Sequence, residues 1–135
     1  MNNTEKSELV IARILHFLME RGIQEGLVEF SELNLDEELA DFFFPCFVWL
    51  EREGLVTSHK VDRYSSNKTR AGGHIVNPSL TSHGYAVLGG IIVIGDQSYS
   101  ASEAVAQVSE KGRSYSGIGD FFGGLLGGLT KSLGS

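Results

Sequence analysis

The chain has 135 residues, of which 41% are hydrophobic, and this length fits one small domain with an appendage. Its formal charge of −6 opposes strong non-specific binding to nucleic acids, because contacts with phosphates dominate that binding. Cys46 is the only cysteine, which excludes a disulfide framework and a thiolate metal cluster within the chain. The first residues are polar, and no apolar run approaches the ~20 residues needed to span a bilayer, so we expect a cytoplasmic protein without a signal peptide.

The charge is distributed unevenly along the chain. From Glu20 to Glu53 there are ten acidic residues and two basic ones, a local charge of −8. From Gly54 to Val76 four basic residues accompany Asp62 alone, a local charge of +3. The sequence is therefore compatible with binding of a phosphate or an acidic partner by one basic element, the segment from Gly54 to Val76.

The N-terminal third predicts a helix followed by short elements. Residues 7–21 form an amphipathic pattern with apolar positions three and four apart, and Gly22 ends it. Residues 23–30 favour a short strand, and residues 31–35 a turn or a single helical turn.

A second helical block is predicted at residues 36–53, closed by Gly54. Pro45 lies inside it and either kinks one helix or starts a second helix as its first residue. Three consecutive phenylalanines, Phe42 to Phe44, cannot all face one core, because neighbours on a helix point about 100° apart. We expect at least one of these rings to be exposed or to be covered by another element.

The middle of the chain predicts a hairpin and a helix. Residues 55–61 favour a strand, residues 62–73 a polar, basic and flexible stretch, and residues 74–76 a returning strand. A helix is expected from Leu80 to about Leu88.

After this helix, residues 96–100 are expected to form a loop. The pattern Ser100-x-x-Glu103 is typical of a capping box and predicts a short helix over 101–111 that stops at Gly112. The chain would thus divide into a domain at 1–95, a short helix and polar linker at 96–116, and a tail at 117–135.

The tail predicts a helix with a leucine and phenylalanine ridge opposite a glycine repeat. Five interior glycines cost such a helix about 5 kcal/mol relative to alanine, so it must pack against the rest of the chain, another copy or a membrane. The tail residues assigned to such an interaction are Ile118, Phe121, Phe122, Gly123, Leu125, Leu126, Gly127 and Leu129.

The segments WLEREGLV (residues 49–56) and LTSHGYAVL (residues 80–88), with the helix, strand and hairpin around them, resemble a bacterial winged helix-turn-helix domain over residues 7–92. The resemblance implies an α+β, mostly helical fold with a three-helix core, a β-hairpin wing and, here, a C-terminal helical appendage. The tail is similar to the C-terminus of some uncharacterised small bacterial proteins, a similarity that carries no activity. Because one fold serves repressors, adaptors and structural modules, it does not decide the function.

The block that corresponds to the recognition helix departs from the family. A helix that reads DNA presents basic or amide side chains, whereas this block presents Glu37, Glu38, Asp41 and the phenylalanines. We therefore expect a protein-interaction surface here, formed by Phe42, Phe43, Phe44 and Phe47 together with the tail. The remaining candidates for nucleic-acid contact lie in the wing and are Lys60, Arg63, Tyr64, Lys68 and Arg70.

The sequence offers no arrangement of catalytic residues. The four histidines form no metal-binding pair on a helix, although His59 and His74 are candidates to face each other across the hairpin. We expect no enzyme, cofactor or metal, but a non-enzymatic protein that self-associates or docks a protein partner. The alternatives are a DNA-binding regulator that uses the wing, an acidic immunity or antitoxin-type inhibitor of a basic enzyme, and a membrane-surface protein, for which Lys131 alone supplies little cationic charge.

Overall fold

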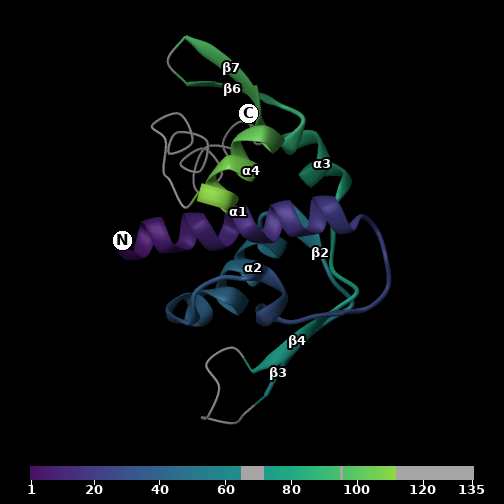
Figure 1. The fold of residues 1–135 in the computed structure, drawn as a ribbon. Coiled ribbons are helices and arrows are strands. Elements are labelled where there is room, and N and C mark those ends of the chain that lie inside the picture. The colour runs from purple at the N-terminus through teal and green to yellow at the C-terminus, as the bar shows by residue number, and fades with distance from the viewer. Residues whose placement is uncertain (65–71, 95, 112–135) are drawn as a thin grey trace.

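The computed structural model describes residues 1–64, 72–94 and 96–111, with the backbone alone for residues 91–94 and 111. These residues adopt an α+β fold of helices and small antiparallel sheets (Figure 1). The predicted tail, the Gly112 stop and part of the predicted basic stretch lie outside the described residues.

Helix α1 (Asn3–Arg21) runs through the middle of the molecule (Figure 1). It begins four residues earlier than predicted because Asn2 caps it: the Asn2 Oδ1 accepts a hydrogen bond from the Glu5 N–H at 2.8 Å. Gly22 ends the helix as expected, and its N–H donates to the Leu18 carbonyl at 3.0 Å. The buried face of α1 includes Val10, Ile14 and Leu18, so it forms one wall of the core.

The predicted block at 36–53 is two helices of different kinds. A 3₁₀ helix, η2 (Glu37–Phe42), passes directly into α2 (Phe43–Arg52). Pro45 lies in the first turn of α2, as its third residue, where its missing N–H costs no helical hydrogen bond. Before them, η1 (Phe30–Leu33) occupies the predicted single turn.

Three strands form the main sheet, in the order β1-β4-β3, all antiparallel. They are β1 (Leu27–Val28), β3 (Lys60–Arg63) and β4 (Gly73–Val76). The predicted strand at 55–61 is split: its first part, β2 (Val56–Thr57), pairs instead with β5 (Ser79–Leu80). The two pairings hold the β3–β4 hairpin below the helices in the view of Figure 1.

Helix α3 (Ser82–Leu88) is fixed to the end of α2 by Thr81 and Gly84. The Thr81 Oγ1 accepts from the Gly84 N–H at 2.9 Å and donates to the Gly54 carbonyl at 2.6 Å. Gly54 has a φ of +80°, a conformation that glycine adopts without strain. Gly84 lies so close to residue 55 that a Cβ there would come within 2.2 Å of the Leu55 carbonyl oxygen.

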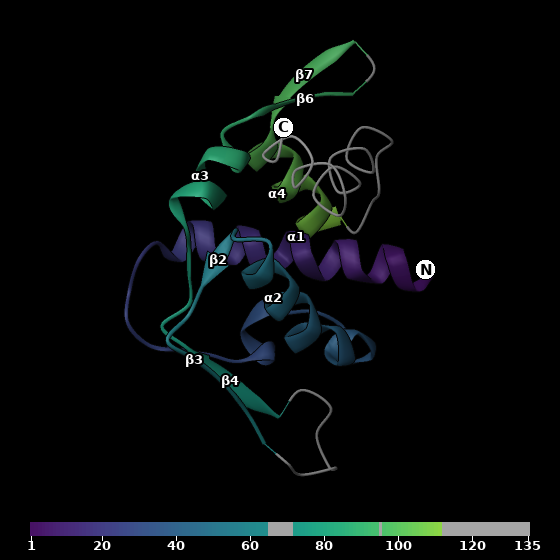
Figure 2. The same cartoon turned by 180° about the vertical axis from the view of Figure 1, so that it is seen from behind.

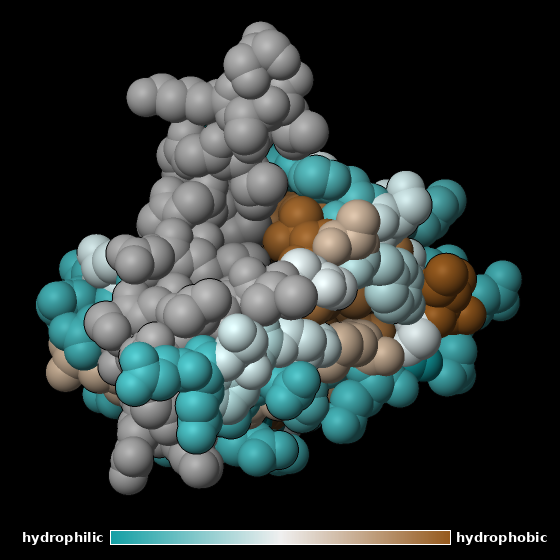
Figure 3. All heavy atoms as spheres, turned by 90° about the horizontal axis from the view of Figure 1, so that it is seen from above, coloured by the Kyte–Doolittle hydropathy of each residue, from teal (hydrophilic) through white to brown (hydrophobic). Residues whose placement is uncertain are grey.

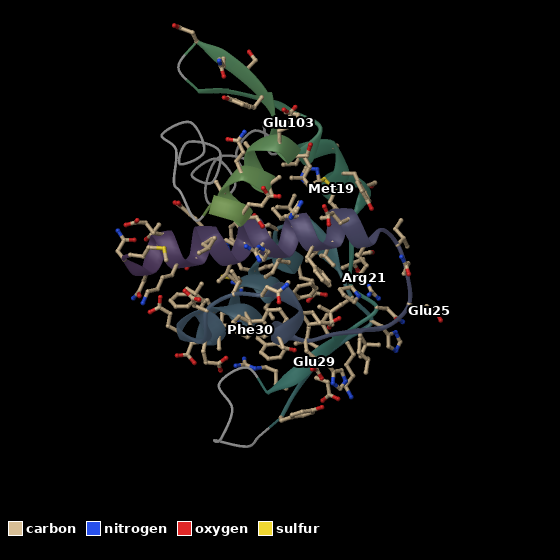
Figure 4. The ribbon with its side chains drawn as sticks, in the orientation of Figure 1. Met19, Arg21, Glu25, Glu29, Phe30 and Glu103 are labelled. Atoms are coloured by element: carbon tan, nitrogen blue, oxygen red, sulfur yellow. The ribbon has the colours of Figure 1, made fainter. Side chains whose placement is uncertain are left out.

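The prediction of a loop at 96–100 is wrong. Strand β7 (Gln97–Ser100) pairs there with β6 (Ile91–Ile94), which the sequence analysis did not predict. The hairpin then leads into α4 (Ala101–Lys111), where the predicted capping box is present. The Ser100 Oγ accepts from the Glu103 N–H at 3.1 Å, and the Ser100 N–H donates to the Glu103 carboxylate at 3.4 Å. Figure 4 marks Glu103 at the start of this helix.

Arg13 ties α1 to two neighbouring elements. Its Nε donates to the Ser109 Oγ of α4 at 2.5 Å, and its Nη1 donates to the Leu33 carbonyl of η1 at 2.5 Å. The Ser109 carbonyl accepts a further bond from Nη2. Burial lowers the pKa of Arg13, while nearby Glu110 opposes that shift. Arg13 thus supplies hydrogen-bond donors to the side chain and the carbonyl of the buried Ser109, and these bonds attach α4 to the core.

Candidate protein-interaction surfaces

The phenylalanine cluster forms core and not an exposed surface. Phe43, Phe44 and Phe47 are each 1% exposed, and Phe42 is half-buried. Phe43 packs edge-on against Phe44 and against Phe30 of η1, with ring centroids 4.9 and 5.7 Å apart. The interaction surface predicted at Phe42–Phe47 is therefore wrong for these three rings. They are covered, as the sequence analysis allowed, but elements of the chain itself supply the cover, because α2 packs against both α1 and η2.

The residues of η2 and α2 that face solvent form what we call the outer face. From Glu38 onward they recur at spacings of three and four, as one side of a helix requires. Its members are Glu37, Glu38, Asp41, Pro45, Val48 and Arg52. Val48 is 37% exposed and stands among the few large apolar side chains that face solvent in the described chain. The outer face is thus acidic at one end and apolar in the middle.

The β3–β4 hairpin carries a hydrogen-bonded group of polar side chains. His74 lies directly opposite Asp62, and its Nε2 is 3.5 Å from the Asp62 Oδ2. The Tyr64 hydroxyl is 3.3 Å from the His74 Nδ1, and the planes of the two rings are nearly perpendicular, in a T-shaped arrangement. These contacts order the hairpin beside the outer face, and Tyr64 remains 54% exposed.

The predicted wing residues do not share one environment. Lys60 is exposed on β3, an edge strand. Arg63 is exposed too, but its guanidinium carbon lies 5.0 Å from the centre of the Phe44 ring, a cation–π contact. Lys68 and Arg70 lie outside the described residues. The described wing residues Lys60, Arg63 and Tyr64 are thus all exposed, but Arg63 contacts Phe44 and Tyr64 contacts His74.

A hollow of about 270 Å³ opens between the hairpin and the two 3₁₀ helices. It is lined by Glu29, Phe30, Ser31, Glu37, Tyr64, Gly72 and Gly73. Figure 4 marks Glu29 and Phe30 on the side of the molecule that carries the hairpin. The hollow thus combines two carboxylates with an exposed phenol ring, a set that suits a cationic side chain.

The histidines and the cysteine have structural surroundings. His59 and His74 do not face each other, because His74 pairs with Asp62 across the hairpin. The His16 Nε2 lies 3.2 Å from the Glu20 Oε1, one helical turn away. The described residues contain no group of three or more His, Cys, Asp and Glu side chains placed to hold a metal ion. Burial raises the pKa of the Cys46 thiol to about 12, against a weak hydrogen bond to the Ser7 carbonyl that lowers it. Such a thiol is a poor nucleophile.

One face of the described chain is mainly polar. Seen from above, hydrophilic residues dominate and apolar residues form small separate areas (Figure 3). None of the described helices combines the length and the apolar character needed to cross a membrane. The tail residues assigned to an interaction, from Ile118 to Leu129, lie outside the described part of the chain.

Two surfaces were missed in the sequence. Pro45 and Val48 alternate with buried positions at helical spacing, so a helical projection that starts at Phe43 places them on the outside. The β6–β7 hairpin carries a Gly-Asp pair between its strands, a recognised two-residue turn signal.

Comparison of the chain with protein-family models, with curated proteins and with solved structures finds no match.

Proposed function

We propose that this chain is a non-enzymatic interaction protein, built on a winged-helix unit, that self-associates or docks a protein partner. The order of elements supports the unit: a helix, a short strand, helical segments and a hairpin follow one another. The first strand pairs with the second strand of the hairpin, in the order β1-β4-β3, which is the arrangement that a winged helix requires.

The outer face carries the proposal. In a winged helix it occupies the position from which α2 would meet the DNA major groove. Here it presents Glu37, Glu38 and Asp41 next to Pro45 and Val48, with Arg52 as its only basic member. Carboxylates repel phosphates, whereas an acidic surface with an apolar centre suits a protein.

The hollow beside the outer face supports a partner with basic side chains. Glu29 and Glu37 line it together with Tyr64, so an arginine or lysine of the partner would meet two carboxylates and an aromatic ring. The charge of −8 between Glu20 and Glu53 favours the same partner chemistry. An inhibitor of a basic enzyme is one form of this function.

DNA binding through the wing is the second candidate. The exposure of Lys60 and Tyr64 on the projecting β3–β4 hairpin favours it, because such hairpins reach a backbone or a minor groove. The stacking of Arg63 on Phe44 weighs against it, since a phosphate contact would have to break that cation–π pair.

Two measurements separate these functions. The first is absolute mass by light scattering over a concentration series, for the full chain and for a chain stopped at Ser116. The second is titration with duplex DNA at low and moderate salt. We expect association between proteins and no DNA binding. Binding that falls steeply with salt and is lost when Lys60 and Arg63 become alanine would instead assign the DNA function.

A further inference from the structure

The hairpin of β6 and β7, residues 90–100, which we call the β6–β7 arm, projects from the body. Both views show it extending beyond α3 and α4 (Figures 1 and 2). Its base is closed by the Ala101 N–H, which donates to the Gly90 carbonyl at 2.6 Å. Within the described chain its sheet has two strands and no third. Both strands of the arm contact α4, and because a two-stranded ribbon on its own is marginally stable in water, a third strand would stabilise the outer part of the arm.

Among the described residues, β7 is exposed on both of its sides at the outer end of the arm. Gln97 and Ser98 are neighbours in β7, so they belong to opposite sides of the ribbon, and both are exposed. Their cross-strand partners in β6 are Ile94 and Val93. A partner therefore has open access to the arm at these positions.

The outer edge of β6 has none of the features that block strand pairing. All four residues from Ile91 to Ile94 are β-branched and apolar, without the charge, proline or bulge that protects an edge strand. In an antiparallel ribbon every second residue of a strand turns its N–H and C=O away from its neighbour. The outer edge of β6 thus offers unpaired backbone groups to another strand.

We propose that β6 pairs antiparallel with β6 of a second copy of this chain, across a twofold axis, to make a four-stranded sheet. This rests on the proposed function and names the partner and surface for self-association. With the axis through Val93, Val93 opposes Val93 of the partner subunit and Ile92 opposes Ile94 of the partner subunit, because residues directly opposite each other in an antiparallel pair share one face of the sheet. These pairs are apolar, so the edge is complementary to itself.

The charge of the arm is compatible with a second copy as the partner. Asp96 is the single charged residue from Gly89 to Ser102, so the arm has no pattern that selects an oppositely charged protein. Each chain carries a formal charge of −6, and close contact between two acidic bodies is unfavourable. The arm lies on the opposite side of α1 from η2 and α2 (Figure 1), so pairing through arms keeps the acidic outer faces apart.

The test compares the full chain with two matched lysine variants. Val93→Lys places a charge on β6, and Ser98→Lys places the same charge on its direct cross-strand partner in β7. Sedimentation equilibrium over micromolar to millimolar concentrations gives the dimer dissociation constant. We expect a reversible dimer for the wild type, a loss of about tenfold or more in affinity for Val93→Lys, and near-wild-type affinity for Ser98→Lys.

Three results would overturn the inference: a wild type that stays monomeric at every concentration, a Val93→Lys dimer as strong as the wild type, or an equal loss in both variants. Circular dichroism melting of both variants shows whether a loss reflects unfolding. If the chain stopped at Ser116 loses association while Val93→Lys keeps it, the tail is the interface. That result refutes the pairing of β6 and leaves the proposed function standing.

Discussion

Substitution of Gly84 by alanine tests how α3 is joined to the end of α2. A Cβ at this position would lie 2.2 Å from the Leu55 carbonyl oxygen and 3.1 Å from the Leu55 carbonyl carbon. The Leu55 carbonyl has little room to move, because it accepts from the Thr81 N–H at 3.0 Å and the Leu55 side chain is 1% exposed. The added methyl group must therefore push two segments apart.

The expected magnitude comes from two opposing effects. Overpacking of a tight contact costs about 1–3 kcal/mol, and weakening the Thr81–Leu55 bond costs about 1 kcal/mol more. Alanine recovers about 1 kcal/mol over glycine in a helix. We therefore expect Gly84→Ala to lower the free energy of unfolding by about 1–3 kcal/mol.

Urea denaturation measures this loss, with Gly89→Ala as the matched control at the other end of the same helix. A Cβ at Gly89 would meet carbonyl oxygens at 3.5 Å, which is ordinary van der Waals contact. We expect the control to be neutral or up to about 1 kcal/mol more stable. Equal unfolding free energies for the two variants would refute the close approach of α3 to Leu55.

Three further predictions concern single side chains. Thr81→Val removes the cap of α3 and the bond to the Gly54 carbonyl, and it should lower the unfolding free energy in urea by about 1–2 kcal/mol; an unchanged value would contradict this role. Arg13→Met leaves the Leu33 carbonyl without its donor and should lower the free energy of unfolding by about 2–4 kcal/mol. Thermal unfolding checks this against Arg52→Met, a substitution of an exposed arginine, which should cost less. Cys46 should react with a thiol reagent at about pH 8 only after unfolding, because burial raises its pKa from 9.0 to about 12, and fast labelling of the native protein would contradict this burial. Since the pKa is higher in the folded protein, the contribution of Cys46 to stability is complete below pH 9.0 and is lost as the pH rises toward 12.

The helices were predictable where local signals agree with tertiary packing. The amphipathic stripe of α1, its end at Gly22 and the capping box at Ser100 each depend on a few neighbouring residues, and the structure confirms all three. The turn after α2 follows from Gly54 in the same way.

The phenylalanine surface was not predictable because burial depends on what surrounds a helix. A helix that packs against one neighbour has a single apolar side, but α2 packs against α1, η2 and, through Arg63, the hairpin. The change from 3₁₀ to α geometry at Phe42 also alters the angle between successive rings. Phe43 and Phe44 are therefore both buried, although they point in different directions.

The β6–β7 arm was missed for a different reason. A half-buried strand alternates apolar and polar residues, whereas β6 is apolar throughout and β7 has Tyr99 as its one apolar or aromatic residue, so neither has a clear period of two. A short run that is apolar throughout cannot be told from a segment of a buried helix by periodicity alone.

The measurement that tests the central claim most directly is the absolute mass of the full chain by light scattering, over a concentration series and alongside a DNA titration. The account predicts a mass that rises above the 14.7 kDa of one chain as the concentration increases, with no salt-dependent binding of DNA. A constant mass of 14.7 kDa together with steeply salt-dependent DNA binding would contradict a protein that acts through contacts with other proteins.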